Sequence, residues 1–252
     1  MNKKVTFRKN IHKKKKFKKY MQKDFFEKQE WGKNQLVCGV DEVGRGCLAG
    51  PLVVAAVILY PNNRLKLLKD SKVLTREELL KVYPRIISNS WYSFGIINNI
   101  DIDKFNIWRS TLLAMRQAIM NLFAICPKLP TLILSDNMPI SLENTHFKDI
   151  EIQYFPEGES ISRSIAAASI IAKVKRDSLM QMYDEYLPGY EFGKHKGYGT
   201  KDHQNALSKN GQSILHRESF LKKFKHLFNK EFDFTQINLF EQIEIINSID
   251  KE

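Results

Sequence analysis

Residues 39–59, GVDEVGRGCLAGPLVVAAVIL, decide the fold of this 252-residue chain. An apolar run ends at Asp41 and Glu42, and a second run, PLVVAAVILY over residues 51–60, follows a glycine-rich turn. The second run is apolar on both faces, as expected of a strand in the middle of a sheet that helices cover on both sides. The stretch therefore predicts two central strands of an α/β protein.

The two adjacent acids raise a geometrical problem. Neighbouring side chains of a regular strand point to opposite faces, so Asp41 and Glu42 can serve one site only where the backbone departs from the strand. Gly44 and Gly46 follow at once. Glycine adopts backbone conformations that other residues avoid, so the departure is expected at this point.

Further strands and helices alternate along the chain. Strands are predicted over residues 91–100, 131–137 and 150–159, and helices over residues 74–89, 103–125 and 162–188. Thr75 and Glu78 have the spacing of a capping box at the start of the first helix. The second helix carries an apolar stripe, interpreted as packing surface, at Trp108, Thr111, Leu112, Met115, Ile119 and Leu122.

Three regions are predicted. Residues 1–34 form a basic, disordered extension, residues 35–188 an α/β core, and residues 189–252 a smaller helical region with a tail. Small residues around Ala166, Ala167 and Ala168 would let the last helix of the core approach the sheet closely.

Composition limits the class of protein. With 43% apolar residues the chain can bury a substantial core, and no apolar run is long enough to span a bilayer or to serve as a secretory signal. A soluble, cytoplasmic monomer is expected. Cys38, Cys47 and Cys126 lack C-x-x-C spacing, so neither a zinc site nor a disulfide framework is expected, and the three are predicted to be small buried residues.

The positive charge is concentrated at the N-terminus. Residues 1–34 hold 13 Lys and Arg against 3 Asp and Glu, which accounts for +10 of the net charge of +12. Lysines interleaved with Phe7, Phe17 and Tyr20 suit contact with a nucleic-acid backbone, independent of base sequence. The alternative is a solvated extension that only keeps the protein in solution.

Four carboxylates follow strand-like segments: Asp41, Glu42, Asp136 and Glu159. Acids that converge at one edge of a sheet repel one another unless cations lie between them. Oxygen-only ligand sets suit Mg²⁺ or Mn²⁺, and two such ions about 4 Å apart can hold a phosphodiester for hydrolysis. The four acids are therefore candidate catalytic residues around divalent cations.

These residues belong to longer motifs. The segment GVDEVGRGCLAGPLVVAAVIL resembles the signature of bacterial ribonuclease HII, the type 2 ribonuclease H. The likeness continues through DSKVLT, SIAAASIIAKVKRD, KHKGYGTKDH and HRESF, in the family's order, over roughly residues 36–224. It implies a ribonuclease H-like α/β fold, with a mixed five-stranded sheet flanked by helices and a helical C-terminal region that helps grip the duplex.

The resemblance also implies an activity. Such enzymes hydrolyse the phosphodiester on the 5′ side of ribonucleotides in RNA/DNA hybrids and at single ribonucleotides in duplex DNA, leaving a 3′-hydroxyl and a 5′-phosphate, with two Mn²⁺ or Mg²⁺ ions. In similar proteins the backbone of the Gly44, Arg45 and Gly46 triplet bonds the ribose 2′-hydroxyl, and Tyr198 stacks on the next deoxyribose. Phosphate contacts are expected from Lys72 and Lys196, and less strongly from Lys173 and Arg217.

The resemblance implies that Asp41, Glu42 and Asp136 are metal ligands. The chain departs from the family pattern at the fourth acid and beside the third. Residues 157–159 read EGE where the family usually has Lys-Gly-Asp, so Glu159 is one methylene longer and Glu157 adds negative charge. Asn137 stands where a glycine usually follows Asp136, and asparagine is the residue after glycine that best tolerates positive φ. Asp177 is interpreted as a structural partner of basic neighbours.

Three alternatives stay open at this point. Glu159 and Glu157 could have spoiled the second metal position, leaving a non-hydrolytic or weakly active protein that binds RNA/DNA hybrids. The type 3 relative shares the fold and favours longer RNA tracts, but it usually carries a folded N-terminal domain. The segment QINLF, Gln236 to Phe240, resembles the short peptide with which replication proteins dock on the sliding clamp, or it is an amphipathic tail that packs on the body.

Overall fold

The computed structural model describes residues 24–61, 65 and 74–227. Five strands form one sheet in the order β3-β2-β1-β4-β5. β1 pairs antiparallel with β2, and β2 antiparallel with β3, whereas β4 lies parallel to β1 and to β5. The strands are β1 (Val37–Val43), β2 (Leu52–Leu59), β3 (Ser90–Ile97), β4 (Leu132–Asp136) and β5 (Glu151–Phe155). The mixed five-stranded sheet predicted from the sequence is confirmed.

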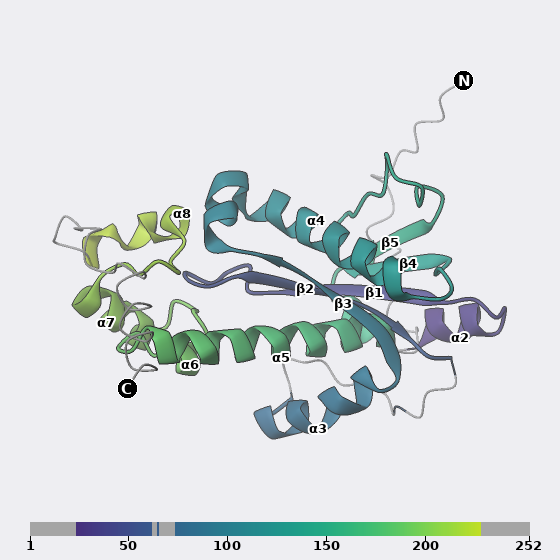
Figure 1. Ribbon diagram of the computed structural model, residues 1–252, viewed down its shortest axis with the longest axis horizontal. Coiled ribbons are helices and arrows are strands. Elements are labelled where there is room, and N and C mark those ends of the chain that lie inside the picture. Colours follow the sequence, from purple (N-terminus) through teal and green to yellow (C-terminus); the bar gives the residue numbers. More distant parts are fainter. Residues whose placement is uncertain (1–23, 62–64, 66–73, 228–252) are drawn as a thin grey trace, which may run out of the picture.

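Helices cover both faces of this sheet. Figure 1 shows α4 on one face and α5, with α3 beside it, on the other, while the short C-terminal helices gather at one end. The helices are α2 (Phe25–Trp31), α3 (Arg76–Ile87), α4 (Asn99–Ile125), α5 (Arg163–Tyr186), α6 (Phe192–His195), α7 (Lys201–Asn210) and α8 (Glu218–Leu221), with 3₁₀ turns at Gly158–Ser160 and Lys222–Leu227. The capping box of Thr75 and Glu78 is present at α3.

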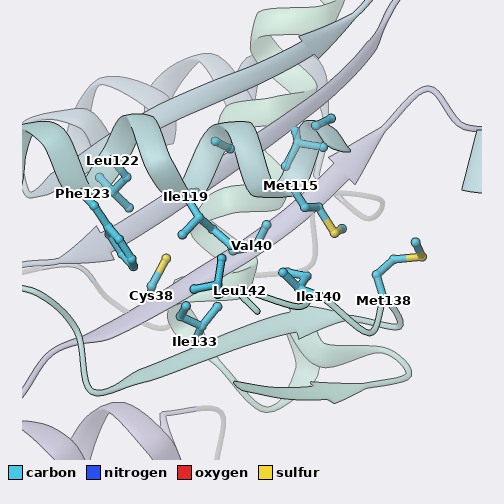
Figure 2. Close-up of a cluster of buried hydrophobic side chains, with 14 of the residues drawn as sticks. Cys38, Val40, Met115, Ile119, Leu122, Phe123, Ile133, Met138, Ile140 and Leu142 are labelled. Carbon is cyan, nitrogen blue, oxygen red and sulfur yellow. The ribbon is translucent and has the colours of Figure 1, made fainter. Parts of the chain in front are cut away.

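The central strand divides the core into two. Alternate residues of β2 pack either with α4 or with α3 and α5, and all eight residues of the strand are buried. Figure 2 shows the α4 side, where Met115 and Ile119 of the helix meet Cys38 and Val40 of β1. A strand with two buried faces fits the continuous apolar run from which it was predicted.

α5 lies unusually close to β1. A Cβ atom built on Gly39 would come within 2.1 Å of the backbone carbon of Ser164, so only glycine fits there. Ala166, Ala167 and Ala168 are completely buried against the sheet, as their size predicted. This close packing brings the polar residues further along α5 to the end of β1.

The folded part of the chain begins before residue 35, where the sequence predicted its start. Within residues 24–34, α2 packs on the core through Phe26, and the buried Glu27 accepts hydrogen bonds from the Ser162 hydroxyl at 2.6 Å and the Ser164 amide at 2.8 Å. These contacts cap the start of α5. The lysine-rich residues 1–23 lie outside the described residues, so their predicted disorder and nucleic-acid contact stay predictions.

α4 differs from its prediction at its N-terminal end. The helix begins at Asn99 and is kinked at Asn106, which has φ 64° and ψ 161°. Trp108 lies in the first turn after the kink and is 47% exposed, while Thr111, Met115, Ile119 and Leu122 of the predicted stripe are buried. The stripe was therefore wrong at Trp108, because the neighbouring residue Ile107 packs against the core in the first turn after the kink.

Beyond α5 the chain forms the short helices and loops expected after Pro188. This C-terminal region contacts the loop between β1 and β2, where the Leu48 amide donates to the Gly197 carbonyl at 2.8 Å and the Gly50 amide to the Leu215 carbonyl at 2.9 Å. No helix in the described part of the chain is both long enough and apolar enough to cross a bilayer.

Candidate active site

Asp41 and Glu42 remain within a regular strand. β1 continues to Val43, and its register pairs Asp41 with Ala55 and Glu42 with Val54. Ala55 belongs to the core beneath α5 and Val54 to the core beneath α4, so the two acids start from opposite faces of the sheet. The expected departure of the backbone lies after the pair, at Gly44, where φ is 94°.

A pocket at the end of β1 nevertheless reaches both acids. It has a volume of about 290 Å³ and wraps around the strand end. Its lining comes from β1 and the following turn, β4, α5 and the loop before α7: Asp41, Glu42, Val43, Gly44, Arg45, Gly46, Asp136, Ser169, Lys173 and Tyr198. Three of the four predicted acids and the whole glycine-rich triplet therefore share one cavity.

The carboxylates lie close enough to affect one another. Burial, followed by the negative charges of Glu42 and Asp136, raises the pKa of the Asp41 carboxyl well above its usual range, although a hydrogen bond with Ser169 opposes the shift. Glu159 acts on Asp41 in the same direction and is itself 2% exposed, but it does not line the pocket. Mutual repulsion among buried carboxylates favours the binding of a cation between them.

The acids also have other partners in the protein, and Asp41 Oδ1 accepts the Glu42 amide at 2.8 Å. Glu42 Oε1 lies 3.2 Å from Arg45 Nη1, and Asp136 Oδ1 accepts the Gly158 amide at 2.7 Å. Asn137 after Asp136 has φ 53°, as its residue type suggested. Gly158 belongs to the EGE segment, so a hydrogen bond couples the third acid to the turn that carries the fourth.

A divalent cation fits this donor set by its chemistry. The carboxylate oxygens are the hard ligands that Mg²⁺ and Mn²⁺ prefer, and Asp41 lies among three other acids. No group of three acids, histidines or cysteines among the described residues is already arranged around one ion. Glu42 Oε1 pairs with Arg45, so a bound cation would share the Glu42 carboxylate with that guanidinium.

The two glycines of the triplet have different surroundings. Gly44 is buried, and a Cβ atom there would lie 2.3 Å from Nε of Arg176. Gly46 is exposed, and a Cβ atom there would have no atom within 4 Å. Gly44 is therefore required by the fold, whereas Gly46 leaves open space in the pocket into which a ligand backbone can come close.

Tyr198 is contributed to the pocket by the loop before α7. The residue is 39% exposed, and its hydroxyl is hydrogen-bonded to the thiol of the buried Cys47, next to Gly46. Burial raises the pKa of Tyr198. The bond to Cys47 orients the ring and links it to the triplet. Cys38 is also buried, as predicted, whereas Cys126 is partly exposed.

The predicted phosphate contacts divide into three groups. Lys173 lines the pocket and pairs at 2.8 Å with Asp177, which is the structural role expected of that acid. Lys196 does not line the pocket, because its Nζ donates to the Gly193 carbonyl. Lys72 lies outside the described residues. Ser169, four residues before Lys173 on α5, was missed as a site residue; two polar positions at i and i+4 on a face of small residues were the available signal.

The prediction that Arg217 contacts phosphate is wrong. Arg217 is completely buried and donates to the carbonyls of Gly50 and Arg45. The three histidines of the motifs are also buried, and they have structural roles. His203 Nε2 lies 3.0 Å from His216 Nε2, and the rings of His195 and His203 stack at 4.2 Å.

Together the fold and the site define a nuclease with a ribonuclease H-like fold, whose acids meet at the end of the central strand beside a glycine-lined pocket. Comparison with known proteins gives the family. The family model of ribonuclease HII matches residues 38–223. The chain belongs to the ribonuclease HII family, and its activity is that of ribonuclease HII, an endonuclease that hydrolyses RNA in RNA/DNA hybrids.

Individual relatives agree with this assignment. Ribonuclease HII of Lactobacillus gasseri is 44% identical over 196 residues, which cover 77% of this chain and 74% of that protein. Ribonuclease HII of Borreliella burgdorferi is 43% identical over 189 residues, which cover 73% of this chain and 98% of that protein. The type 2 assignment from the motifs is confirmed.

Solved structures share the fold. The structure of the PCNA:RNase HII complex from Archaeoglobus fulgidus matches with a TM-score of 0.64 at 24% identity, covering 78% of this chain and 98% of that chain. Bst-RNase HIII in complex with Mn²⁺ matches with a TM-score of 0.57 at 24% identity, covering 74% of this chain and 64% of that chain. Enzymes of the ribonuclease H family depend on divalent metal ions.

Proposed function

We propose that Asp41, Glu42 and Asp136 hold the catalytic cation in this chain, with Glu159 as the fourth acid of the site. The observation that carries this proposal is the pocket of about 290 Å³ that Asp41, Glu42 and Asp136 line together. The raised pKa of Asp41, caused by burial and by the charges of the other three acids, agrees with this proximity. Divalent cations bound there, Mn²⁺ or Mg²⁺, supply charge neutralisation and Lewis-acid activation for hydrolysis of a phosphodiester. The Gly158 amide holds the Asp136 carboxylate in place.

The substrate is positioned by the chain's own polar groups. Lys173 lies at the pocket, where its ammonium group can approach a phosphate of the strand being cut. The open space beside Gly46 admits the sugar of a ribonucleotide, whose 2′-hydroxyl distinguishes RNA from DNA. Tyr198, oriented by Cys47, would stack on the deoxyribose that follows. The cut then falls 5′ to the ribonucleotide, both in hybrids and at single ribonucleotides within duplex DNA.

A nicking assay tests these roles. Purified protein is incubated with a duplex that holds one ribonucleotide, with Mg²⁺ or Mn²⁺, and a nick 5′ to that ribonucleotide is expected. Asp136→Asn keeps the size of the side chain but removes its charge, so a loss of roughly 100-fold or more in rate is expected. Asp149→Asn, at an exposed acid outside the pocket, is the matched control. Equal rates for both variants would contradict the assignment.

Glu159 needs a separate test because the family usually has aspartate there. If Glu159 serves as the fourth acid, Glu159→Gln lowers the nicking rate in both metals, and Glu159→Asp shifts the ratio of the Mg²⁺ rate to the Mn²⁺ rate. The alternative, a binding protein without hydrolysis, predicts that the wild-type chain binds the duplex but nicks it in neither metal. The wild-type assay alone therefore separates the two.

We also propose that Gln236–Phe240 docks on a sliding clamp. This segment lies outside the described residues, and the support is its likeness to clamp-docking peptides, together with the Archaeoglobus fulgidus relative solved in complex with PCNA. Capture of the purified full-length chain on immobilised clamp is expected to be lost in Phe240→Ala. Phe232→Ala, in the same tail but outside the segment, is the control, and unchanged capture of Phe240→Ala would refute the docking site.

A further inference from the structure

Two arginines lie behind the pocket without reaching it. Arg176 of α5 and Arg217 before α8 are completely buried, and neither lines the cavity. All their hydrogen bonds that the structure shows go to backbone carbonyls. A buried guanidinium is costly unless its donors are satisfied, so a pair held by carbonyls alone indicates that the position of those carbonyls matters.

Arg217 holds the backbone of the triplet. Its Nη1 donates to the Arg45 carbonyl at 3.1 Å, while Nε and Nη2 donate to the Gly50 carbonyl at 3.1 and 2.9 Å. The guanidinium thus joins the two ends of the turn between β1 and β2. Burial lowers the pKa of Arg217 to about 10, so the side chain stays charged at neutral pH.

The contact with Arg45 has a consequence for its neighbour. The Arg45 carbonyl and the Gly46 amide belong to one planar peptide group, and in a trans peptide they point in opposite directions. Arg217 holds the carbonyl on the buried side, so the Gly46 N–H points away from it. No acceptor within the described residues receives this N–H, and Gly46 lines the pocket.

Arg176 joins two segments that lie next to the pocket. It donates to the carbonyls of Ala49 at 3.1 Å, Pro51 at 2.9 Å and Lys196 at 2.8 Å, and its guanidinium carbon lies 5.8 Å from the centre of the Tyr198 ring. It therefore joins the β1–β2 turn to the segment that carries Tyr198. Its side chain also occupies the space that a Cβ of residue 44 would need.

We infer that Arg176 and Arg217 are positioning residues for sugar recognition: Arg217 aims the Gly46 N–H at the ribose 2′-hydroxyl, and Arg176 sets the distance between the triplet and Tyr198. This inference rests on the proposed role of the triplet and Tyr198. A lysine in place of either arginine keeps the charge but cannot bond two separate carbonyls through a planar fork.

Sugar discrimination is measured by binding, with Ca²⁺ in place of Mg²⁺ so that no cleavage is needed. Dissociation constants are determined for a duplex with one ribonucleotide and for the all-DNA duplex of the same sequence. The binding ratio is the dissociation constant of the all-DNA duplex divided by that of the ribonucleotide duplex. Arg217→Lys and Arg176→Lys are each expected to reduce this ratio by about 10-fold, the effect of one misaligned hydrogen bond. Binding of the all-DNA duplex should be unchanged. In the nicking assay, KM for the ribonucleotide duplex should rise by a similar factor, with a smaller change in kcat.

Arg163→Lys is the matched control. Arg163 is also a buried arginine of α5, but it bonds the Leu65 carbonyl and stacks on Trp31. It should lower the melting temperature without changing the binding ratio. A wild-type ratio in folded Arg217→Lys and Arg176→Lys, or a ratio that falls equally in Arg163→Lys, would overturn the inference.

Two further variants make the result unambiguous. Gly46→Ala fills the open space directly and should lower the binding ratio if the triplet reads the sugar; an unchanged ratio there refutes the proposed role of the triplet, independently of the arginines. If Arg217→Lys does not fold, Asp103→Ala replaces it. Asp103 accepts the Glu218 and Ser219 amides at 2.7 and 3.1 Å, so its loss frees the segment next to Arg217. An unchanged ratio in Asp103→Ala then overturns the inference for Arg217.

Discussion

Gly44 and Gly46 show how one motif can contain the same residue for two different reasons. The turn needs positive φ at Gly44, and Arg176 fills the space beside it, so this glycine serves the fold. Gly46 has neither constraint, and its lack of a side chain leaves room in the pocket. A motif read as a whole cannot separate these roles, because the neighbour of Gly44 is contributed by a helix more than a hundred residues later.

The two alanine substitutions should therefore separate stability from activity. Gly44→Ala is expected to lower the free energy of unfolding by about 2–4 kcal/mol, since strain at positive φ adds to the contact with Arg176. Gly46→Ala should leave stability within about 0.5 kcal/mol of wild type while it slows nicking roughly 100-fold. Denaturant unfolding and the nicking assay measure the two effects. Equal destabilisation by both variants would contradict the distinction.

At the scale of single elements, α2 acts as an external cap for α5. Glu27 accepts hydrogen bonds from Ser162 and Ser164 at the first turn of that helix, although burial raises the pKa of its carboxyl. Glu27→Ala leaves these donors without their acceptor and should cost about 2–3 kcal/mol of stability. Glu27→Gln keeps an acceptor oxygen without a buried charge and should cost less. Thermal unfolding compares both with Gln29→Ala, an exposed position of α2; a loss in Gln29→Ala as large as in Glu27→Ala would contradict the capping role.

Elements with a strong local pattern were predictable, and those that depend on distant contacts were not. The run at β2 and the capping box at α3 are visible in the sequence, because burial on both faces and a Thr-x-x-Glu spacing leave a local trace. α2 has a short, charged sequence, and its order comes from a partner 135 residues away. The kink at Asn106 depends on an asparagine at positive φ, which the apolar period does not reveal.

The same distinction holds for the site. Asp41, Glu42 and Asp136 were predictable because acids that follow apolar strands are conspicuous, and the structure places them on one pocket. Arg217 was not, because the sequence shows a charge but not its burial. Its basic character suggested phosphate, whereas its environment is a set of carbonyls.

For the whole molecule, the junction between the core and the C-terminal region includes buried histidines that are neutral. His203 Nδ1 lies 3.0 Å from the Tyr198 carbonyl and can donate to it, and the Ser213 amide donates to His216 Nδ1 at 2.9 Å. The 3.0 Å contact between the two Nε2 atoms then needs His216 as donor and His203 as acceptor. Each ring nitrogen of His203 and His216 is thus a donor or an acceptor in a hydrogen bond. An added proton on either accepting nitrogen would place two N–H groups facing each other.

Acid should therefore weaken the fold through this junction. Burial lowers the pKa of His203 to about 4 and that of His216 to about 3, whereas in the unfolded chain both titrate near 6.5. Between pH 6.5 and about 4 the unfolded state binds protons that the folded state excludes, so each histidine removes up to about 1.4 kcal/mol of stability per pH unit. Above pH 6.5 the effect vanishes.

His203→Gln, measured by urea unfolding at pH 7.5, 6.0 and 5.0, should lose less stability over this range than wild type. His146→Gln, at an exposed histidine, should match wild type. Parallel losses in wild type and His203→Gln would show that the junction does not set the acid sensitivity of the molecule.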